Sequence, residues 1–341
     1  MRPRDIVRPN AIPLFCSIMS RRSAALLVAF VAIAQPAQAQ SLADAKTCDQ
    51  AIGGSAVARA AIQRMMTAHA TTPLAHFATG CQFVMTAAWD SAAVHFDAAV
   101  KGNPGSSAAY LWVGNIAGQK MRMSATPKDK VILAPAIRDA YTRAVALDGA
   151  NIDAREGLMQ YLLDAPAILG GDKAKAGEQA LAIGRVNPFR GLSAKIAVAS
   201  SGNDRPAVEK LLQQATTQFP DSVIGWANLS AMQADDHRPA DAFATITRWQ
   251  ARRTHPMFAL FSIGRTAAVT GEQLDRGEQA LKQFLRGQRS PNDPPLANAH
   301  FRLAQIYEKQ KKNVEAKAEY QFAVKLNPSL RDAQLALERL H

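Results

Sequence analysis

The chain has 341 residues, a formal net charge of +12 and an apolar content of 48%, but only 6% of its residues are aromatic. Strands favour Val, Ile and aromatic side chains, so this alanine-rich composition excludes a sheet-based fold and indicates closely packed helices. A basic charge of this size points to nucleic acid only when the protein shares a compartment with it.

The first stretch of the chain has the three parts of a secretory signal peptide. Arg21 and Arg22 form a charged head, residues 24–34 form an apolar run, and a small-x-small cleavage site ends at Ala39. The apolar run is too short to span a bilayer, which requires about 20 residues. We therefore predict a signal peptide over residues 1–39, a periplasmic mature chain and no transmembrane segment after cleavage.

The residues before the charged head fit a signal peptide poorly. Asp5 and several prolines precede it, which indicates a non-native extension over residues 1–18 and makes Met19 an alternative start to Met1. The paired arginines leave a twin-arginine signal as another alternative. Cleavage removes five arginines and one aspartate, a net charge of +4, so the mature chain keeps +8. Export separates the protein from nucleic acid, and we expect no nucleic-acid partner.

Residues 40–72 are predicted to form N-terminal capping helices. Two short helical stretches lie between residues 41 and 69, and Gly53-Gly54 separates them, because consecutive glycines interrupt a helix. A stack of helices needs such a cap, since its end would otherwise expose apolar surface.

A pattern of small and large side chains recurs along the rest of the chain at fixed distances before a turn residue. The first clear copy covers 73–106 and contains Pro104, and two more cover 223–256 and 297–330. The matching slots hold Gly80, Phe83, Ala92, Phe96 and Ala99, then Trp226, Leu229, Ser230, Ala242 and Ile246, then Leu303, Ala304, Tyr307, Ala316, Tyr320 and Ala323. This pattern resembles the tetratricopeptide repeat, a helix-turn-helix unit of 34 residues.

Weaker copies fill the intervals between the clear ones. They end at Gly149, Pro188 and Pro220, and the loosest covers 257–290, which gives seven repeats over 73–330. The resemblance implies an all-α fold, a right-handed α-solenoid of about seven tetratricopeptide-like helix hairpins. Small residues are expected where helices cross closely, and large ones between successive hairpins. Residues 331–341 are predicted to form a C-terminal capping helix.

Two segments depart from the repeat length. In the second repeat about eleven extra residues lie around 121–134, and in the third a segment over 162–172 contains Gly170-Gly171-Asp172. The glycine pair lacks the spacing of a phosphate-binding loop, so we interpret it as a helix break followed by an N-cap at Asp172. This segment is similar to an insertion between the two helices of some bacterial tetratricopeptide proteins.

Two cysteines, Cys48 and Cys81, remain after cleavage and are 33 residues apart, almost one repeat. In stacked hairpins, residues one period apart lie at similar heights on neighbouring helices, so these two can come within disulfide range. An oxidising compartment favours the bond. We treat Cys48 and Cys81 as a candidate disulfide, with two separately buried thiols as the alternative.

The sequence contains no recognisable catalytic or metal-binding pattern. The seven histidines include no H-x3-H or H-E-x2-H pair, and no serine lies in a G-x-S-x-G elbow. We therefore predict no catalytic residue, no cofactor and no metal, and a protein that is not an enzyme. An envelope enzyme, or a subunit of one, is the least favoured class of function.

The resemblance implies a concave groove lined by the first helix of each repeat. The candidate groove residues in the clear copies are Phe77, Cys81 and Val84, then Ala227 and Ala231, then Asn298, Phe301, Gln305 and Glu308. The Lys and Asn slots with which some family members hold a peptide's terminal carboxylate are not filled, so that clamp is not expected.

These residues lead to two hypotheses about function. The first is a periplasmic tetratricopeptide-repeat scaffold or adaptor that binds a protein or peptide partner in its concave groove. The alternative is a solute-binding or transport-accessory protein, in which the inserts of repeats 2 and 3 form a small-molecule pocket.

Overall fold

The structure is a computed structural model that describes residues 46–68, 71–124 and 126–340. This part of the chain contains helices and no strands, which confirms the predicted all-α fold. The predicted signal peptide over 1–39 lies outside the described residues. None of the described helices is both long and apolar enough to cross a membrane.

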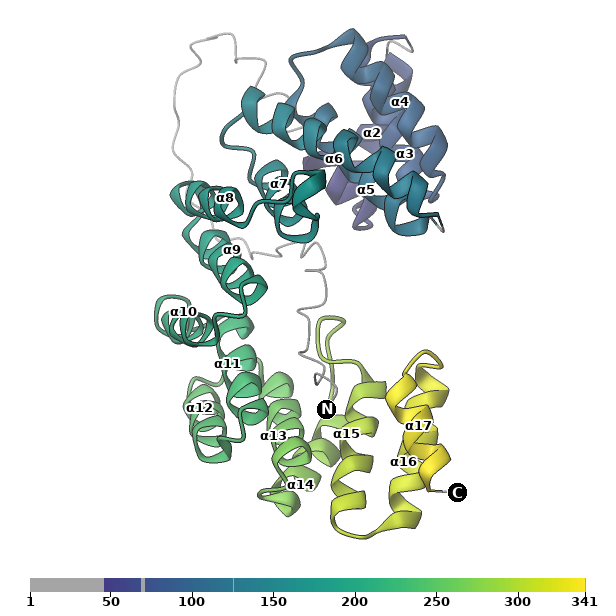
Figure 1. The fold of residues 1–341 in the computed structure, drawn as a ribbon. Helices are drawn as coiled ribbons and strands as arrows, with labels where there is room; N and C mark the ends of the chain where they lie inside the picture. Colours follow the sequence, from purple (N-terminus) through teal and green to yellow (C-terminus); the bar gives the residue numbers. More distant parts are fainter. Residues whose placement is uncertain (1–45, 69–70, 125, 341) are drawn as a thin grey trace, which may run out of the picture. The chain divides into compact units, whose positions relative to one another are not determined.

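The first of two compact units ends at Ala194 and carries the earlier helices (Figure 1). Helices α3 and α4, α5 and α6, and α7 and α8 pack as successive pairs, and α2 packs on α3. The bounds are α2 Ala56–Ala68, α3 Pro73–Met85, α4 Trp89–Gly102, α5 Ser107–Met123, α6 Pro127–Leu147, α7 Ile152–Asp164, α8 Lys173–Val186 and α9 Pro188–Ser201, the last of which crosses the unit boundary.

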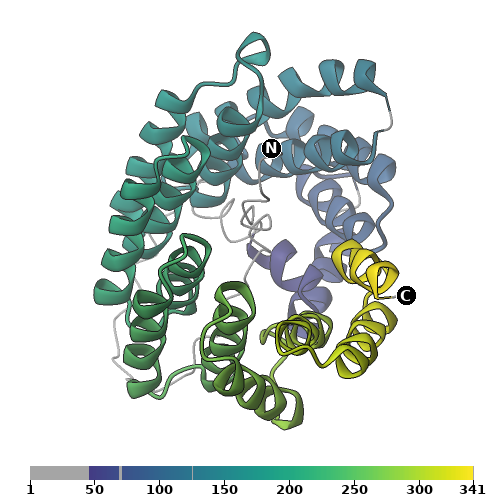
Figure 2. The ribbon, with the colours of Figure 1, turned by 60° about the horizontal axis from the view of Figure 1, so that its bottom comes forward.

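The second unit begins at Lys195 and carries the later pairs, which end at the yellow C-terminal helix in Figures 1 and 2. Helices α11 and α12, α13 and α14, and α15 and α16 each pack together, and α17 packs on α16. The bounds are α10 Arg205–Gln218, α11 Val223–Asp235, α12 Pro239–Ala251, α13 Pro256–Thr270, α14 Leu274–Arg286, α15 Leu296–Lys309, α16 Asn313–Leu326 and α17 Arg331–Arg339. Helices α9 and α10 occupy the position of the remaining predicted hairpin in the chain, and α10 packs on α11.

The small residues of the repeat lie where two helices of a pair meet. A methyl group on Gly80 of α3 would lie 2.9 Å from the Phe96 ring of α4, and one on Gly114 of α5 would lie 2.7 Å from Tyr141 of α6. Phe96 is completely buried and Tyr141 is 8% exposed. The recurring pattern therefore encodes a close contact between a small residue and a large one, which in these two hairpins is a glycine against a ring.

The two extra segments are accommodated in different ways. Around 121–134 the extra residues lengthen both helices of the second pair, so α5 has 17 residues and α6 has 21 where most others have 13 or 14. Over 162–172 the chain forms a short 3-10 turn between α7 and α8, and the Tyr161 hydroxyl donates to the Leu169 carbonyl at 2.5 Å. Asp172 caps α8 by accepting hydrogen bonds from two backbone N–H groups, which confirms the predicted helix break and N-cap.

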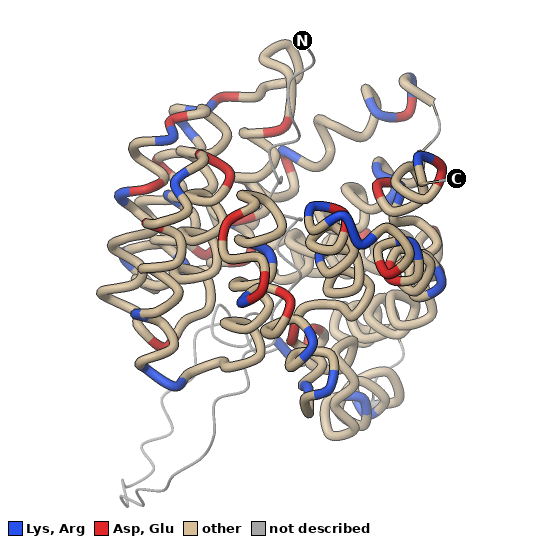
Figure 3. Tube along the Cα trace, turned by 90° about the horizontal axis from the view of Figure 1, so that it is seen from below, with Lys and Arg blue, Asp and Glu red and all other residues tan. Residues whose placement is uncertain are grey.

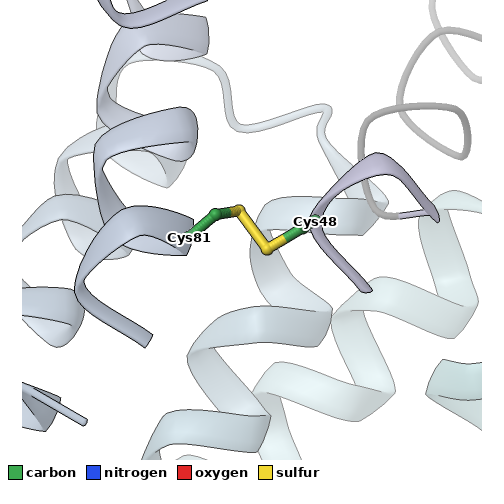
Figure 4. Close-up of a disulfide and its surroundings, with 2 residues drawn as sticks. All are labelled: Cys48 and Cys81. Atoms are coloured by element: carbon green, nitrogen blue, oxygen red, sulfur yellow. A yellow bond between two sulfur atoms is a disulfide. The ribbon is translucent and has the colours of Figure 1, made fainter. Parts of the chain in front are cut away.

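The N-terminal described residues form a short helix over 46–52, followed by a turn and α2. Gly54 in this turn has a φ of +96°, a conformation that favours glycine. The structure joins Cys48 of the short helix to Cys81 of α3 by a disulfide, with an S–S distance of 2.14 Å and a Cα–Cα distance of 5.6 Å (Figure 4). Both cysteines are completely buried.

Candidate functional site

A hollow of about 650 Å³ lies beside α15 and α17 in the second unit. Its lining consists of one face of α15, the ring of Tyr320 on α16 and one face of α17. A second hollow, of about 470 Å³, extends from the same face of α15 to Ala268 and Val269 on α13. The two hollows share Arg302, Gln305 and Glu308, so they adjoin each other along α15.

The sequence of α15 determines which side chains reach these hollows. Phe301, Gln305 and Glu308 are spaced by four and three residues and therefore share one face of the helix. The residues between them, Leu303 and Ile306 among others, are buried in the core of the unit. On α17 the buried Ala333 anchors the helix, while Leu335 and Arg339 line the hollow.

Arg302 is the cation that both hollows share. Its Nη1 donates a hydrogen bond to the Gln305 amide oxygen at 2.9 Å, and its guanidinium carbon lies 5.2 Å from the centre of the Phe301 ring. No carboxylate of the described residues forms an ion pair with it. Burial, and then the charge of Arg265, lowers the pKa of Arg302 to about 10, while the charges of Asp235 and Asp332 oppose the shift. The guanidinium therefore stays charged at pH 7 while it is poorly solvated.

Three carboxyl groups also line the larger hollow, those of Glu308, Asp332 and Glu338. Glu308 accepts a hydrogen bond from the Tyr320 hydroxyl at 2.7 Å and pairs with Arg339 at 3.3 Å. Arg265 binds both carboxylate oxygens of Asp235, at 3.0 and 2.9 Å. Arg302 differs from Arg339 and Arg265 because, within the described residues, it donates to the neutral amide of Gln305 and forms no ion pair. The half-buried Arg302 guanidinium forms no ion pair within the described residues, so it can make charge-assisted hydrogen bonds to the carboxylate of a ligand.

Elsewhere in the described residues, positive and negative side chains are mixed along the helices. Figure 3 shows lysine and arginine positions interspersed with aspartate and glutamate positions along the helices. Within the described residues no group of three or more His, Cys, Asp or Glu side chains could hold a metal ion. The strongest feature of the described surface is therefore the pair of hollows at Arg302.

Comparisons with known proteins give the fold but no closer relative. No protein-family model matches the sequence, and a comparison with curated proteins finds no match either. Among solved structures, a tetratricopeptide repeat protein from Parabacteroides merdae matches with a TM-score of 0.53 and 14% identity, over 78% of this chain and 97% of that one. The chain has the tetratricopeptide repeat fold. Yeast Tom70 matches with a TM-score of 0.58 and 14% identity, over 92% of this chain and 65% of that one.

The tetratricopeptide register shows why three of the predicted groove residues come together. Phe301, Gln305 and Glu308 share one face of the first helix of their pair, and all three line the larger hollow. Asn298, predicted with them, lines neither hollow and lies in the first turn of α15. Sequence reasoning did not select Arg302, although a lone arginine between apolar residues of a first helix was a usable signal.

The remaining predicted groove residues do not join this site. Ala227 packs against the buried pair Trp226 and Trp249, and the Ala231 carbonyl accepts a hydrogen bond from Arg265 at 3.3 Å. In the first unit, the Phe77 ring packs edge-on against Phe96 at 5.4 Å, and Cys81 is bonded to Cys48. Val84 is half-buried on the same helix. Among the predicted groove residues, Phe301, Gln305 and Glu308 are therefore the ones that line the two hollows described above.

Proposed function

We propose that the chain is an exported tetratricopeptide-repeat scaffold, which holds a peptide segment of a partner protein against α15 in the second unit. The observation that carries the proposal is Arg302, a poorly solvated guanidinium that borders two hollows and has no carboxylate partner in the described part of the chain. The role is binding, and it requires no catalytic residue.

The shape and lining of the site favour a peptide with a carboxylate. Two adjoining hollows of about 650 and 470 Å³ offer more length than a compact solute needs. A carboxylate of the peptide, from an acidic side chain or its C-terminus, forms charge-assisted hydrogen bonds to Arg302. An apolar side chain next to it packs against Phe301 and Leu335, which line the same hollow. This arrangement uses Arg302 in place of the unfilled Lys and Asn slots.

The proposed location rests on the sequence. The charged head, short apolar run and cleavage site over 1–39 support export to the periplasm, where the partner would be an envelope protein. The Cys48–Cys81 disulfide is compatible with an oxidising compartment. Residues of the two inserted segments line neither hollow, so no observation favours the small-molecule alternative.

A peptide selection tests the proposal. We would immobilise the protein, expose it to a random heptapeptide library and sequence the retained peptides. The expected set is enriched in Asp, Glu or a free C-terminus beside an apolar residue. The variant Arg302→Gln should retain at least tenfold less of these peptides, while Arg331→Gln, an exposed arginine on α17 outside both hollows, should retain them unchanged. The proposal would be overturned if the retained peptides were not enriched in carboxylates, or if Arg302→Gln retained them as well as the unmodified protein does.

A further inference from the structure

In the second unit, the hollows lie along a face of α15, the first helix of its pair. In the first unit, the corresponding face of α3 is covered by a segment of the chain itself. In the repeat register Cys81 follows Gly80 as Gln305 follows Ala304, so the two residues occupy equivalent slots. Gln305 lines a hollow, whereas Cys81 is completely buried and bonded to Cys48. We call the surface formed by the first helices α3, α5, α7 and α9 of this unit its inner face.

The short helix over residues 46–52 sits on the inner face through one side only. Cys48 and Ala51, one helical turn apart, are completely buried, while Lys46 and Gln50 are exposed. The Arg59 side chain of α2 donates a hydrogen bond to the Ala51 carbonyl at 3.0 Å. The segment therefore has one packed face and one solvated face, as a bound helical peptide does.

Charged groups of two later helices act on the same segment. Asp49 is subject to the charges of Asp153 on α7 and Arg190 on α9. Arg190 in turn binds Asp153 at 2.5 Å and Glu156 at 2.6 Å, so this charge cluster is fixed in position. The segment is bonded to α3, and its Asp49 carboxyl group lies within electrostatic reach of α7 and α9.

We propose that residues 46–52 are a built-in occupant of the inner face of the first unit, held there by the Cys48–Cys81 disulfide, and that this face takes another copy of the same helical segment once the bond is absent. The turn at Gly54 and α2 already tether the segment to α3, and the disulfide adds a second covalent link that restricts its undocked conformations. A weakly packing segment with two small buried residues can then remain bound. The occupied face leaves the hollows of the second unit as the open sites, and the inference does not depend on their ligand.

Hydrogen exchange on the full chain tests whether the bond holds the segment. In the double variant Cys48→Ala/Cys81→Ala, the amides of residues 46–52 should exchange at least tenfold faster than in the unmodified protein, while α3 and α4 keep their rates. Faster exchange in α3 and α4 as well would mean that the bond only staples the first hairpin. Unchanged exchange in 46–52 would mean that packing alone holds the segment. Either result would overturn the proposal.

Disulfide capture tests whether the face recognises the segment. A synthetic peptide of residues 46–54 is incubated in a thiol–disulfide buffer with the full chain carrying Cys16→Ser and Cys48→Ala, which leaves Cys81 as its single cysteine. The matched control moves the cysteine to the equivalent half-buried slot of the fifth repeat, with Cys81→Ser and Ala231→Cys. The expected mixed disulfide forms at least fivefold more at Cys81 than at position 231. The proposal would be overturned if the peptide were captured equally at Cys81 and at position 231, or if Cys81 captured a scrambled peptide as well as the native one.

Discussion

Replacing Gly191 by alanine should loosen the contact between α8 and α9. A Cβ at this position would lie 2.1 Å from the Cα and 2.6 Å from the backbone N of Gly184, where about 3.4 Å is the ordinary lower limit. Backbone atoms cannot rotate away, so the two helices must separate by more than an ångström. Overpacking of this kind costs about 1–3 kcal/mol, and the gain in helix propensity returns up to about 1 kcal/mol. We expect a net loss of about 1–2 kcal/mol in the free energy of unfolding.

The matched control for this substitution is Gly177 on α8. A Cβ on Gly177 meets no atom within 4 Å, so Gly177→Ala should stabilise the protein by about 0.5–1 kcal/mol through helix propensity alone. Urea denaturation followed by circular dichroism measures both variants against the unmodified protein. The reasoning would be refuted if Gly191→Ala were as stable as Gly177→Ala, because the close approach of the two helices would then have no energetic consequence.

Three further predictions concern polar groups. Burial alone would raise the pKa of Glu278, but hydrogen bonds from Lys282 and Lys312 outweigh it and lower the pKa to about 2. Glu278→Gln should therefore reduce the free energy of unfolding by about 1–2 kcal/mol at pH 7 in urea denaturation. This difference should shrink as the pH falls from 4.5 towards 2. Thr245→Val leaves the buried Gln233 amide oxygen without its 2.8 Å donor and should cost about 1–3 kcal/mol by the same assay, against no loss for the exposed Thr247→Val. Burial and the charge of Asp153 raise the pKa of Asp49 to about 7, while Arg190 opposes the shift; Glu156 and Arg59 are the other charged groups nearby. Ionisation of Asp49 therefore destabilises the docked segment as the pH rises. The hydrogen-exchange protection of residues 46–52 should fall from pH 4 to 7 in the native protein but not in Asp49→Asn.

The helices were predictable because the repeat is written in local side-chain sizes. A hairpin closes when a small residue of its first helix lies against a large residue of its second, as Gly80 does against Phe96. Because these positions recur at fixed distances, the pattern predicts the helix pairs and their number. The extra residues around 121–134 were predicted only as an insertion. Their helical form depends on local signals within the insert, where Thr126 caps α6 and Pro127 is its first residue.

The site was only partly predictable because exposure depends on what packs beside each first helix. Phe77 and Phe301 occupy equivalent slots, yet Phe301 borders a hollow while Phe77 packs against Phe96 on a covered helix. Arg302 was missed because its place beside both hollows depends on how α13 and α17 lie next to α15, and a sequence pattern does not show this arrangement. The Cys48–Cys81 pairing, by contrast, could be considered from the repeat period alone.

The most direct test of the peptide-binding account is a double-mutant cycle between Arg302 and the ligand's carboxylate. Isothermal titration would give the affinity of the unmodified protein and of Arg302→Gln for a selected acidic peptide and for its amide analogue. The account predicts that the amide weakens binding at least tenfold, about 1.4 kcal/mol, in the unmodified protein and has little effect in Arg302→Gln. An equal loss in both proteins would show that the carboxylate binds elsewhere and would contradict the account.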